Sequence, residues 1–323
     1  MRRLYFNLLL LALPIGIFLA WFEIARGNRE TNLFVVKRNL LAAAAARVEI
    51  VCLGPSHAHE GIAPLLVHSN AFNLSAVSQS LYYDCALVEK YAPTLPRLRL
   101  VVLPISYLSM DYELDRSTEE WRAYYYRHFH GIAHRDWRQE SVLRNWSSWF
   151  LYGRDFGISS VRGTLPPVIR SGYDDAGGVV DTRPPDQRTA HPKPDHVRTS
   201  APTAIDRHHA CMYPEFLPVN EARLRELLVF LRSRGIGAVF VTLPTSDGYR
   251  ALEREETRSR TAAALARLKH DFGVEWRDFS ADPRFVEDDF WDADHLNFTG
   301  AAKFSRILGV EVVQPALNRS PAR

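Results

Sequence analysis

Short, nearly continuous apolar runs recur along the chain and are separated by amphipathic stretches. Such runs are typical of parallel strands that are covered on both faces, because these strands have no solvent-facing side. Pro104, near the end of the third run, indicates that strand pairing stops there. The pattern predicts strands at residues 48–53, 71–74, 98–105, 237–243 and 274–278.

Helical periodicity separates these strands. Apolar residues recur on one face of the segments 78–91, 220–234, 250–272 and 300–308. An alternation of strands and helices favours a parallel sheet with helices on both faces and right-handed crossovers. The predicted fold class is therefore α/β, a three-layer α/β/α domain with a mainly parallel sheet, which spans residues 27–323.

The amino-terminal segment has a different pattern. Residues 4–22 carry no charge, and a helix of this length spans roughly 28 Å, close to the thickness of a hydrocarbon core. Arg2 and Arg3 precede it and favour a cytoplasmic amino end. We expect residues 1–26 to form one transmembrane helix that anchors an exported body; a cleaved signal peptide is the alternative.

Two segments of the predicted domain show no clean period. Residues 111–165 are rich in Tyr, Trp, His and Arg, and either a lid, a partner surface or an aromatic packing layer suits this composition. Residues 166–212 are rich in Pro, Gly, His, Asp and Arg. They predict a polar insertion, in which residues 172–209 form a long loop.

Composition excludes several kinds of site. With 40 basic and 37 acidic residues the net charge is +3, which does not indicate a nucleic-acid partner. Three scattered cysteines are too few for a disulfide framework or a zinc site, although one disulfide of unassigned pairing is compatible with them. Histidine pairs at 57/59 and 128/130 have no third ligand at a convincing spacing, so no metal site is predicted.

Two short motifs near opposite ends of the chain carry the candidate chemistry. Ser56 follows the first predicted strand, whereas Asp292 and His295 lie before the last predicted helix. A serine hydroxyl becomes nucleophilic when a histidine takes its proton and a carboxylate orients that histidine. The carboxyl ends of parallel strands meet at one edge of a sheet, and two further strand ends carry Ser106 and residues 244–246. A site built there is predicted to perform acyl transfer.

The two motifs resemble the first and last blocks of the SGNH (GDSL-like) hydrolase superfamily. Residues 51–56 match a strand followed by Gly-x-Ser, and residues 292–300 match Asp-x-x-His with a glycine that opens the final helix. The resemblance covers residues 48–110 and 220–310. It implies that Ser56 is the nucleophile, His295 the base and Asp292 the residue that orients the base, with no cofactor.

The chain departs from this superfamily in two places. Pro55 replaces the usual acid of the first block, and the third block, Gly-x-Asn-Asp, is absent at residues 103–106. Asn73 is therefore the candidate oxyanion donor, together with the Ser56 amide; a plain turn role is the alternative for Asn73. His57, next to Ser56, and Ser106 are candidates to line the substrate site.

Four shorter stretches look like a narrower group, the membrane-anchored SGNH-like proteins of exopolysaccharide and cell-envelope O-acylation. They are residues 56–57, 73–75, 80–84 and 103–107. Some proteins of this group work beside a multi-spanning membrane O-acyltransferase. The resemblance implies an O-acyltransferase that acts on an envelope or exported glycan, is anchored in the bacterial inner membrane and faces the periplasm. Two alternatives are a periplasmic carbohydrate esterase with the same triad and a degenerate domain that binds glycan or scaffolds a membrane complex.

Overall fold

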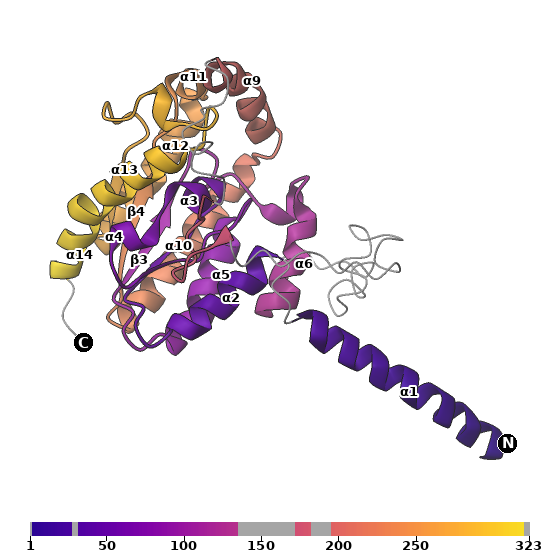
Figure 1. The fold of residues 1–323 in the computed structure, drawn as a ribbon. Helices are drawn as coiled ribbons and strands as arrows, with labels where there is room; N and C mark the ends of the chain where they lie inside the picture. Colours follow the sequence, from indigo (N-terminus) through magenta and orange to yellow (C-terminus); the bar gives the residue numbers. More distant parts are fainter. Residues whose placement is uncertain (1, 28–31, 135–171, 182–194, 320–323) are drawn as a thin grey trace.

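The computed structural model describes residues 2–27, 32–134, 172–181 and 195–319. Its centre is a five-stranded sheet in the order β2-β1-β3-β4-β5, in which all neighbouring strands are parallel (Figure 1). The strands are β1 (Ile50–Cys52), β2 (Ala71–Asn73), β3 (Leu100–Pro104), β4 (Gly237–Thr242) and β5 (Glu275–Asp278). All five predicted strands are confirmed, each with slightly shorter bounds.

Helices cover both faces of this sheet, which confirms the three-layer prediction. Alternate residues of a strand point to opposite faces, so Val51 and Val101 lie in one core and Ile50 and Val102 in the other. The first core contains buried residues of α2 (Leu33–Ala44), α5 (Leu81–Tyr91), α10 (Leu217–Ser233) and α12 (Glu255–Phe272). The second contains buried residues of α3 (Ser56–Gly61), α4 (Pro64–Val67), α13 (Phe298–Leu308) and α14 (Gln314–Arg319).

Two further helices lie over the edge of the sheet at which the strands end. These are α9 (His196–His209) and α11 (Asp247–Arg250), which contact each other (Figure 1). Their buried side chains form a small third core that includes Ala201, Ile205 and Tyr249. This layer covers the edge at which the sequence predicts the active site.

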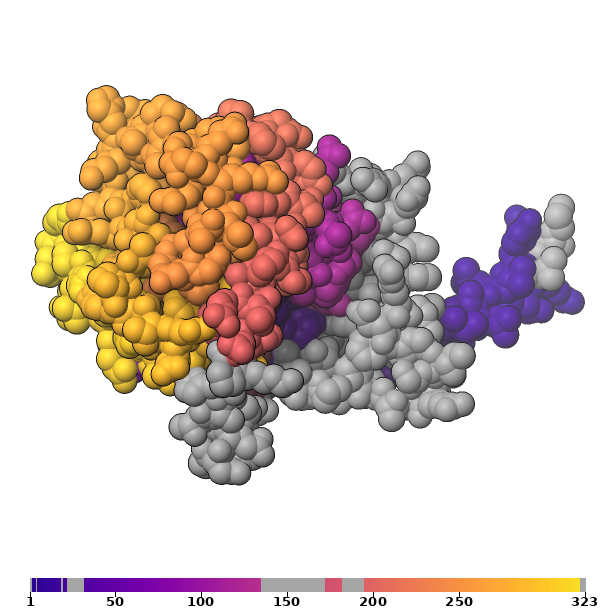
Figure 2. Space-filling view, turned by 90° about the horizontal axis from the view of Figure 1, so that it is seen from above, coloured from indigo at the N-terminus to yellow at the C-terminus, as the bar shows by residue number. Residues whose placement is uncertain are grey.

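The helix α1 (Arg2–Gly27) occupies the segment predicted as an anchor and projects away from the body (Figures 1 and 2). Many of its apolar side chains are exposed, including Leu9 and Leu11 at 67% each. Within the described part of the chain, no helix combines the length and apolarity that crossing a membrane requires.

The segment before β1 forms the helix α2. The helix α2 begins after Asn32, whose side chain accepts hydrogen bonds from the amides of Phe34 and Val35 at 3.0 and 3.1 Å. Val36 and Leu40 are among its buried residues, so this helix is part of the core.

The described part of the aromatic segment is a packing layer. Tyr112, Tyr126 and Phe129 are buried in the first core, and Tyr125 stacks on Phe34 of α2 with ring centroids 5.4 Å apart. The described residues 111–134 therefore favour the packing alternative over a lid. Residues 135–165 lie outside the described residues.

The prediction of a loop at residues 172–209 is wrong for the carboxyl end of that segment, which forms the helix α9 (His196–His209). Its buried positions are spaced as one face of a helix. They are Val197, Ala201, Ala204, Ile205 and His208. Pro202 inside the helix and the surrounding polar residues concealed this stripe in the sequence. Residues 182–194 of the predicted insertion lie outside the described residues.

Candidate active site

Ser56 lies at the carboxyl edge of the sheet, as the first residue of α3 directly after β1. The chain turns into α3 through Gly54, whose φ of +108° is favourable for glycine, and a Cβ there would lie 3.0 Å from Cβ of Pro104. The Gly54 amide donates a hydrogen bond to Oδ1 of buried Asp84 at 2.8 Å. This tight, anchored turn fixes the position of the serine.

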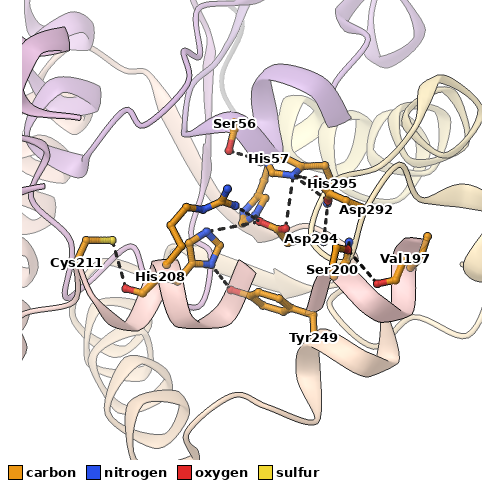
Figure 3. Close-up of polar contacts among 12 residues, drawn as sticks. Ser56, His57, Val197, Ser200, His208, Cys211, Tyr249, Asp292, Asp294 and His295 are labelled. Atoms are coloured by element: carbon orange, nitrogen blue, oxygen red, sulfur yellow. Dashed lines mark hydrogen bonds and ion pairs between the residues drawn. The ribbon is translucent and has the colours of Figure 1, made fainter. Parts of the chain in front are cut away.

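Asp292 and His295 lie on a turn that leads into α13. The Asp292 carboxylate accepts the amides of His295 and Asp294 at 2.8 and 3.1 Å, which closes the turn. The same carboxylate lies 3.0 Å from Nδ1 of His295, and Nε2 of His295 lies 2.8 Å from Oγ of Ser56 (Figure 3). The three side chains thus form one continuous hydrogen-bonded chain across 239 sequence positions.

Contacts with α9 and with the amino-terminal cap of α11 hold the turn of Asp292 and His295 in place. Ser200 of α9 accepts the Ala293 amide at 2.9 Å through its hydroxyl oxygen. The amide of Ser246, which caps α11 after β4, donates to the Ala293 carbonyl at 3.0 Å. The ends of β1 and β4 therefore both contribute contacts here, two of the three strand ends at which the sequence predicts the site.

His295 is buried, and its surroundings favour its charged form. Burial alone would lower its pKa, but the hydrogen bond to Asp292 and the charges of Asp294 and Asp292 outweigh it and raise the pKa to about 9. The imidazole is neutral above that pH. Only the neutral ring can accept the proton of Ser56, so the basic form of this site is populated under alkaline conditions.

Asp294 is close to the triad but does not orient His295 in the manner of Asp292. Its Oδ1 lies 3.6 Å from Nδ1 of His295, whereas its Oδ2 accepts a hydrogen bond from Nε2 of His57 at 3.1 Å. Although burial alone would raise the pKa of Asp294, the hydrogen bond from His57 and the nearby imidazoles hold it well below its usual range. Asp294 is therefore a charged, buried carboxylate.

His57 lines the same cavity as Ser56 and packs against His295. Its ring centroid lies 5.1 Å from that of His295, and its side chain is 6% exposed. It belongs to the same helical turn as Ser56 and binds Asp294, so it links α3 to the turn of Asp292 and Asp294.

His208 is a site residue that the sequence prediction missed, because residues 172–209 were interpreted as a solvated loop. Its Nε2 lies 3.5 Å from Oδ2 of Asp294, and its Nδ1 lies 2.6 Å from the hydroxyl of Tyr249. Burial lowers the pKa of His208 to about 3, so it is neutral at ordinary pH. The helical stripe that ends at His208 is the signal that could have identified it.

The structure contradicts the oxyanion prediction for Asn73. This residue ends β2 with no exposed surface, and its Nδ2 donates to the carbonyls of Ala58 and Ile62 at 3.1 and 2.8 Å. Both amide hydrogens are thus used to support α3, because a buried amide must satisfy its donors within the protein. Asn73 positions the helix of Ser56 and does not point into the site.

Ser106 lies at the predicted strand end but faces a neighbouring pocket. Its hydroxyl lies 2.8 Å from that of Ser109, whose oxygen also accepts the Ser106 amide at 2.9 Å. It lines a cavity with His57 and Tyr249, and Ser56 does not line that cavity. The structure therefore does not bring Ser106 together with the three triad residues.

A cavity of about 290 Å³ opens beside Ser56 and His295. Its other lining residues are mostly polar and include two guanidinium groups. They include His57, Glu60, Ser78, Tyr112, Arg122, Arg207 and His208. Ser78 has a φ of +60°, which is uncommon for a residue with a side chain and places a strained turn at the cavity wall.

Three of these side chains are of types that ligate metals, and the chain also has three cysteines. His57, His208 and Asp294 each place one ligand atom within 4.8 Å of the others. Within this group, His57 donates a hydrogen bond to Asp294 at 3.1 Å, and Nε2 of His208 lies 3.5 Å from the same carboxylate oxygen. Cys52, Cys85 and Cys211 are free, and burial raises the pKa of Cys52 to about 12, as expected for an inert core thiol.

The fold and the site together define a parallel α/β protein with a Ser–His–Asp arrangement at the carboxyl edge of its sheet. No protein-family model matches the chain, and no curated protein matches it. Among solved structures, a GDSL-like lipase from Bacteroides thetaiotaomicron is similar, with a TM-score of 0.42 and 10% identity over 90% of this chain and 100% of that one. A proposed acylhydrolase from Bacteroides fragilis has a TM-score of 0.38 and 10% identity over 86% and 92% of the two chains.

Proposed function

We propose that this protein is a serine-dependent acyl-transfer enzyme of the SGNH type. The observation that carries the proposal is the chain of contacts from Asp292 to Nδ1 of His295, and from Nε2 of His295 to Oγ of Ser56, at 3.0 and 2.8 Å. This is the order of groups that activates a serine hydroxyl. The roles are nucleophile for Ser56, general base for His295 and orienting carboxylate for Asp292.

In the first step, Oγ of Ser56 attacks the carbonyl carbon of an ester while its proton passes to Nε2 of His295. The tetrahedral intermediate collapses when the ester C–O bond breaks, and the leaving alkoxide takes the proton from Nε2. Asp292 keeps the ring in the orientation that both transfers need. The products are an acyl group on Ser56 and a free alcohol.

In the second step, an acceptor hydroxyl gives its proton to Nε2 of His295 and attacks the acyl carbon. The bond to Oγ of Ser56 then breaks, and Oγ regains the proton. If the acceptor is a sugar hydroxyl the reaction is O-acyl transfer, and if it is water the reaction is ester hydrolysis. The same three side chains serve both outcomes, so the acceptor is decided by the cavity.

The acceptor that we propose is a hydroxyl of a cell-envelope or exported polysaccharide. This follows from the resemblance of four sequence stretches to envelope O-acylation proteins. The cavity supports it, because Arg122, Arg207, Ser78 and Tyr112 line the wall beside Ser56 and can bind a hydroxyl-rich molecule. A multi-spanning membrane O-acyltransferase is the proposed partner that would supply acyl groups. Location in the bacterial inner membrane, with the body in the periplasm, is part of the same proposal.

One observation favours a second candidate, a domain that binds glycan without catalysis. The amide of Asn73 is engaged under α3, so the predicted side-chain donor for an oxyanion is missing. A donor aimed at the oxyanion commonly contributes several kcal/mol to the transition state. Turnover is therefore the property that separates the two candidates.

The experiment compares hydrolysis of p-nitrophenyl acetate by the full chain, Ser56→Ala and Ser233→Ala. Ser233 is an exposed serine at the end of α10, far along the chain from the site, and serves as the matched control. Ser56→Ala is expected to lose at least about a thousandfold in kcat/KM, since the residues of a triad act as a unit. Ser233→Ala should match the parent protein.

Adding an acetyl-free bacterial polysaccharide to the same assay distinguishes transfer from hydrolysis. Acetyl esters on the recovered polysaccharide would support transfer, and acetate as the only product would support the esterase alternative. Equal turnover by the parent protein and Ser56→Ala would contradict the proposed function.

A further inference from the structure

Asp294 is a buried charge that the triad alone does not explain. Its side chain has no exposed surface, whereas the side chain of the orienting residue Asp292 is 25% exposed. Burying a carboxylate is costly unless charges or hydrogen bonds compensate it. The chain nevertheless places this second carboxylate 3.6 Å from Nδ1 of His295.

We propose that Asp294 is a second carboxylate of the active site, which stabilises the imidazolium form of His295. His57 and His208 hold the carboxylate of Asp294 in position. This inference rests on the proposed function, because it assigns Asp294, His57 and His208 as positioning residues for the same reaction. None of the three touches the serine oxygen. Figure 3 shows the carboxylate of Asp294 between these imidazoles, which come from separate parts of the chain.

The two oxygens of Asp294 have different surroundings. Oδ2 lies 3.1 Å from Nε2 of His57, 3.5 Å from Nε2 of His208 and 3.8 Å from Nη2 of Arg207. Among the described residues, Oδ1 has no hydrogen-bond partner, and it is the oxygen nearest to His295. A positive charge on His295 would best offset the cost of burying this negatively charged oxygen without a hydrogen bond.

That positive charge appears during the reaction. His295 becomes an imidazolium when it takes the proton of Ser56, and the developing charge lies beside the uncompensated oxygen. An interaction that is stronger in the transition state than in the ground state accelerates the reaction. Asp292 is partly exposed to solvent, which weakens its electrostatic effect, so the fully buried Asp294 adds charge stabilisation that Asp292 alone does not provide.

The groups around Asp294 hold the carboxylate without cancelling its charge. His208 is neutral, and a Tyr249 hydroxyl that donates to its Nδ1 leaves a proton on Nε2 to face Asp294. Arg207 is 61% exposed, so solvent screens its charge. The other titratable groups that interact with His295 or Asp294 include His57, His59 and Glu60 of α3, and Asp292.

The test measures the pKa of His295 in the parent protein and in Asp294→Asn, by NMR titration of its imidazole and by the pH profile of kcat/KM for p-nitrophenyl acetate. Asn keeps the shape and removes the charge. An opposite charge at this distance commonly shifts a pKa by about 1–3 units. In Asp294→Asn, the pKa of His295 from the NMR titration and the pKa from the pH profile should therefore both fall by about that amount. The limiting kcat/KM at high pH should fall at least about tenfold.

Two further variants serve as controls. Asp247→Asn removes a carboxylate that is 97% exposed and should leave both readouts unchanged. Asp292→Asn should lose far more activity than Asp294→Asn, by about ten-thousandfold, because it removes the orienting hydrogen bond.

An unchanged His295 pKa in a folded Asp294→Asn protein would overturn the inference. So would activity that a chelator abolishes and zinc restores, because His57, His208 and Asp294 would then be metal ligands. If the parent protein proved inactive while the NMR pKa still fell in Asp294→Asn, the proposed function would fail and the coupling of the two side chains would stand.

Discussion

At the scale of single residues, His295 decides how the site responds to pH. It lies between Ser56 and the carboxylates of Asp292 and Asp294. The two carboxylates raise the pKa of His295 to about 9, against the effect of burial. Below that pH, the fraction of protein with a neutral imidazole rises tenfold for each pH unit. We expect kcat/KM to rise in the same proportion from pH 6 and to reach a plateau above about pH 9. Measuring initial rates in buffers of constant ionic strength checks this, and a plateau that begins near pH 7 would contradict it.

The residues of the candidate site differ in how far the sequence could predict them. The spacing of Asp292 and His295 on one turn predicted a local pair, and the strand before Ser56 predicted where the serine would lie. Asn73 was misassigned because its partners, the carbonyls of α3, depend on how that helix packs over β2. The helical stripe that ends at His208 is readable in the sequence, but its contact with Asp294 depends on the tertiary fold, since Asp294 lies 86 positions further along the chain.

At the scale of elements, the close approach of α13 to the preceding turn holds the His295 turn in place. A Cβ added at Gly300 would lie 2.1 Å from the carbonyl oxygen of Asp289, so Gly300→Ala must push the helix away. The expected loss is about 1–3 kcal/mol in the free energy of unfolding, measured by chemical denaturation. Gly248→Ala in α11 is the matched control, because its nearest contact would be an ordinary 3.6 Å. Equal stability of the two variants would show that this approach is not a constraint.

The elements that the sequence predicted well are those with a strong local pattern. The strands β1, β3 and β4 are apolar runs, and α10 and α13 have clear apolar faces. The predicted helix at 250–272 is divided in the structure, because Ser246 caps the short helix α11 and α12 begins only at Glu255. The helix α9 was missed because its polar composition and Pro202 resemble a loop, and its stability depends on packing over the sheet edge.

At the scale of the whole molecule, the fold brings together two motifs that lie at opposite ends of the domain. The parallel sheet places the ends of β1 and β4 at one edge, and α9 and α11 cover that edge and hold the turn of Asp292 and His295. The membrane attachment expected for residues 1–26, the glycan acceptor and the membrane partner stay predictions, since they concern contacts outside this chain.

The most direct test of the central claim is intact-mass spectrometry of the full chain after treatment with a fluorophosphonate, which reacts with activated serines. We expect one adduct on the parent protein and on Ser233→Ala, and none on Ser56→Ala or His295→Ala. Labelling should accelerate as the pH approaches 9, because it requires neutral His295. A folded parent protein that acquires no adduct, or an adduct that persists in Ser56→Ala, would contradict the assignment of Ser56 as an activated nucleophile.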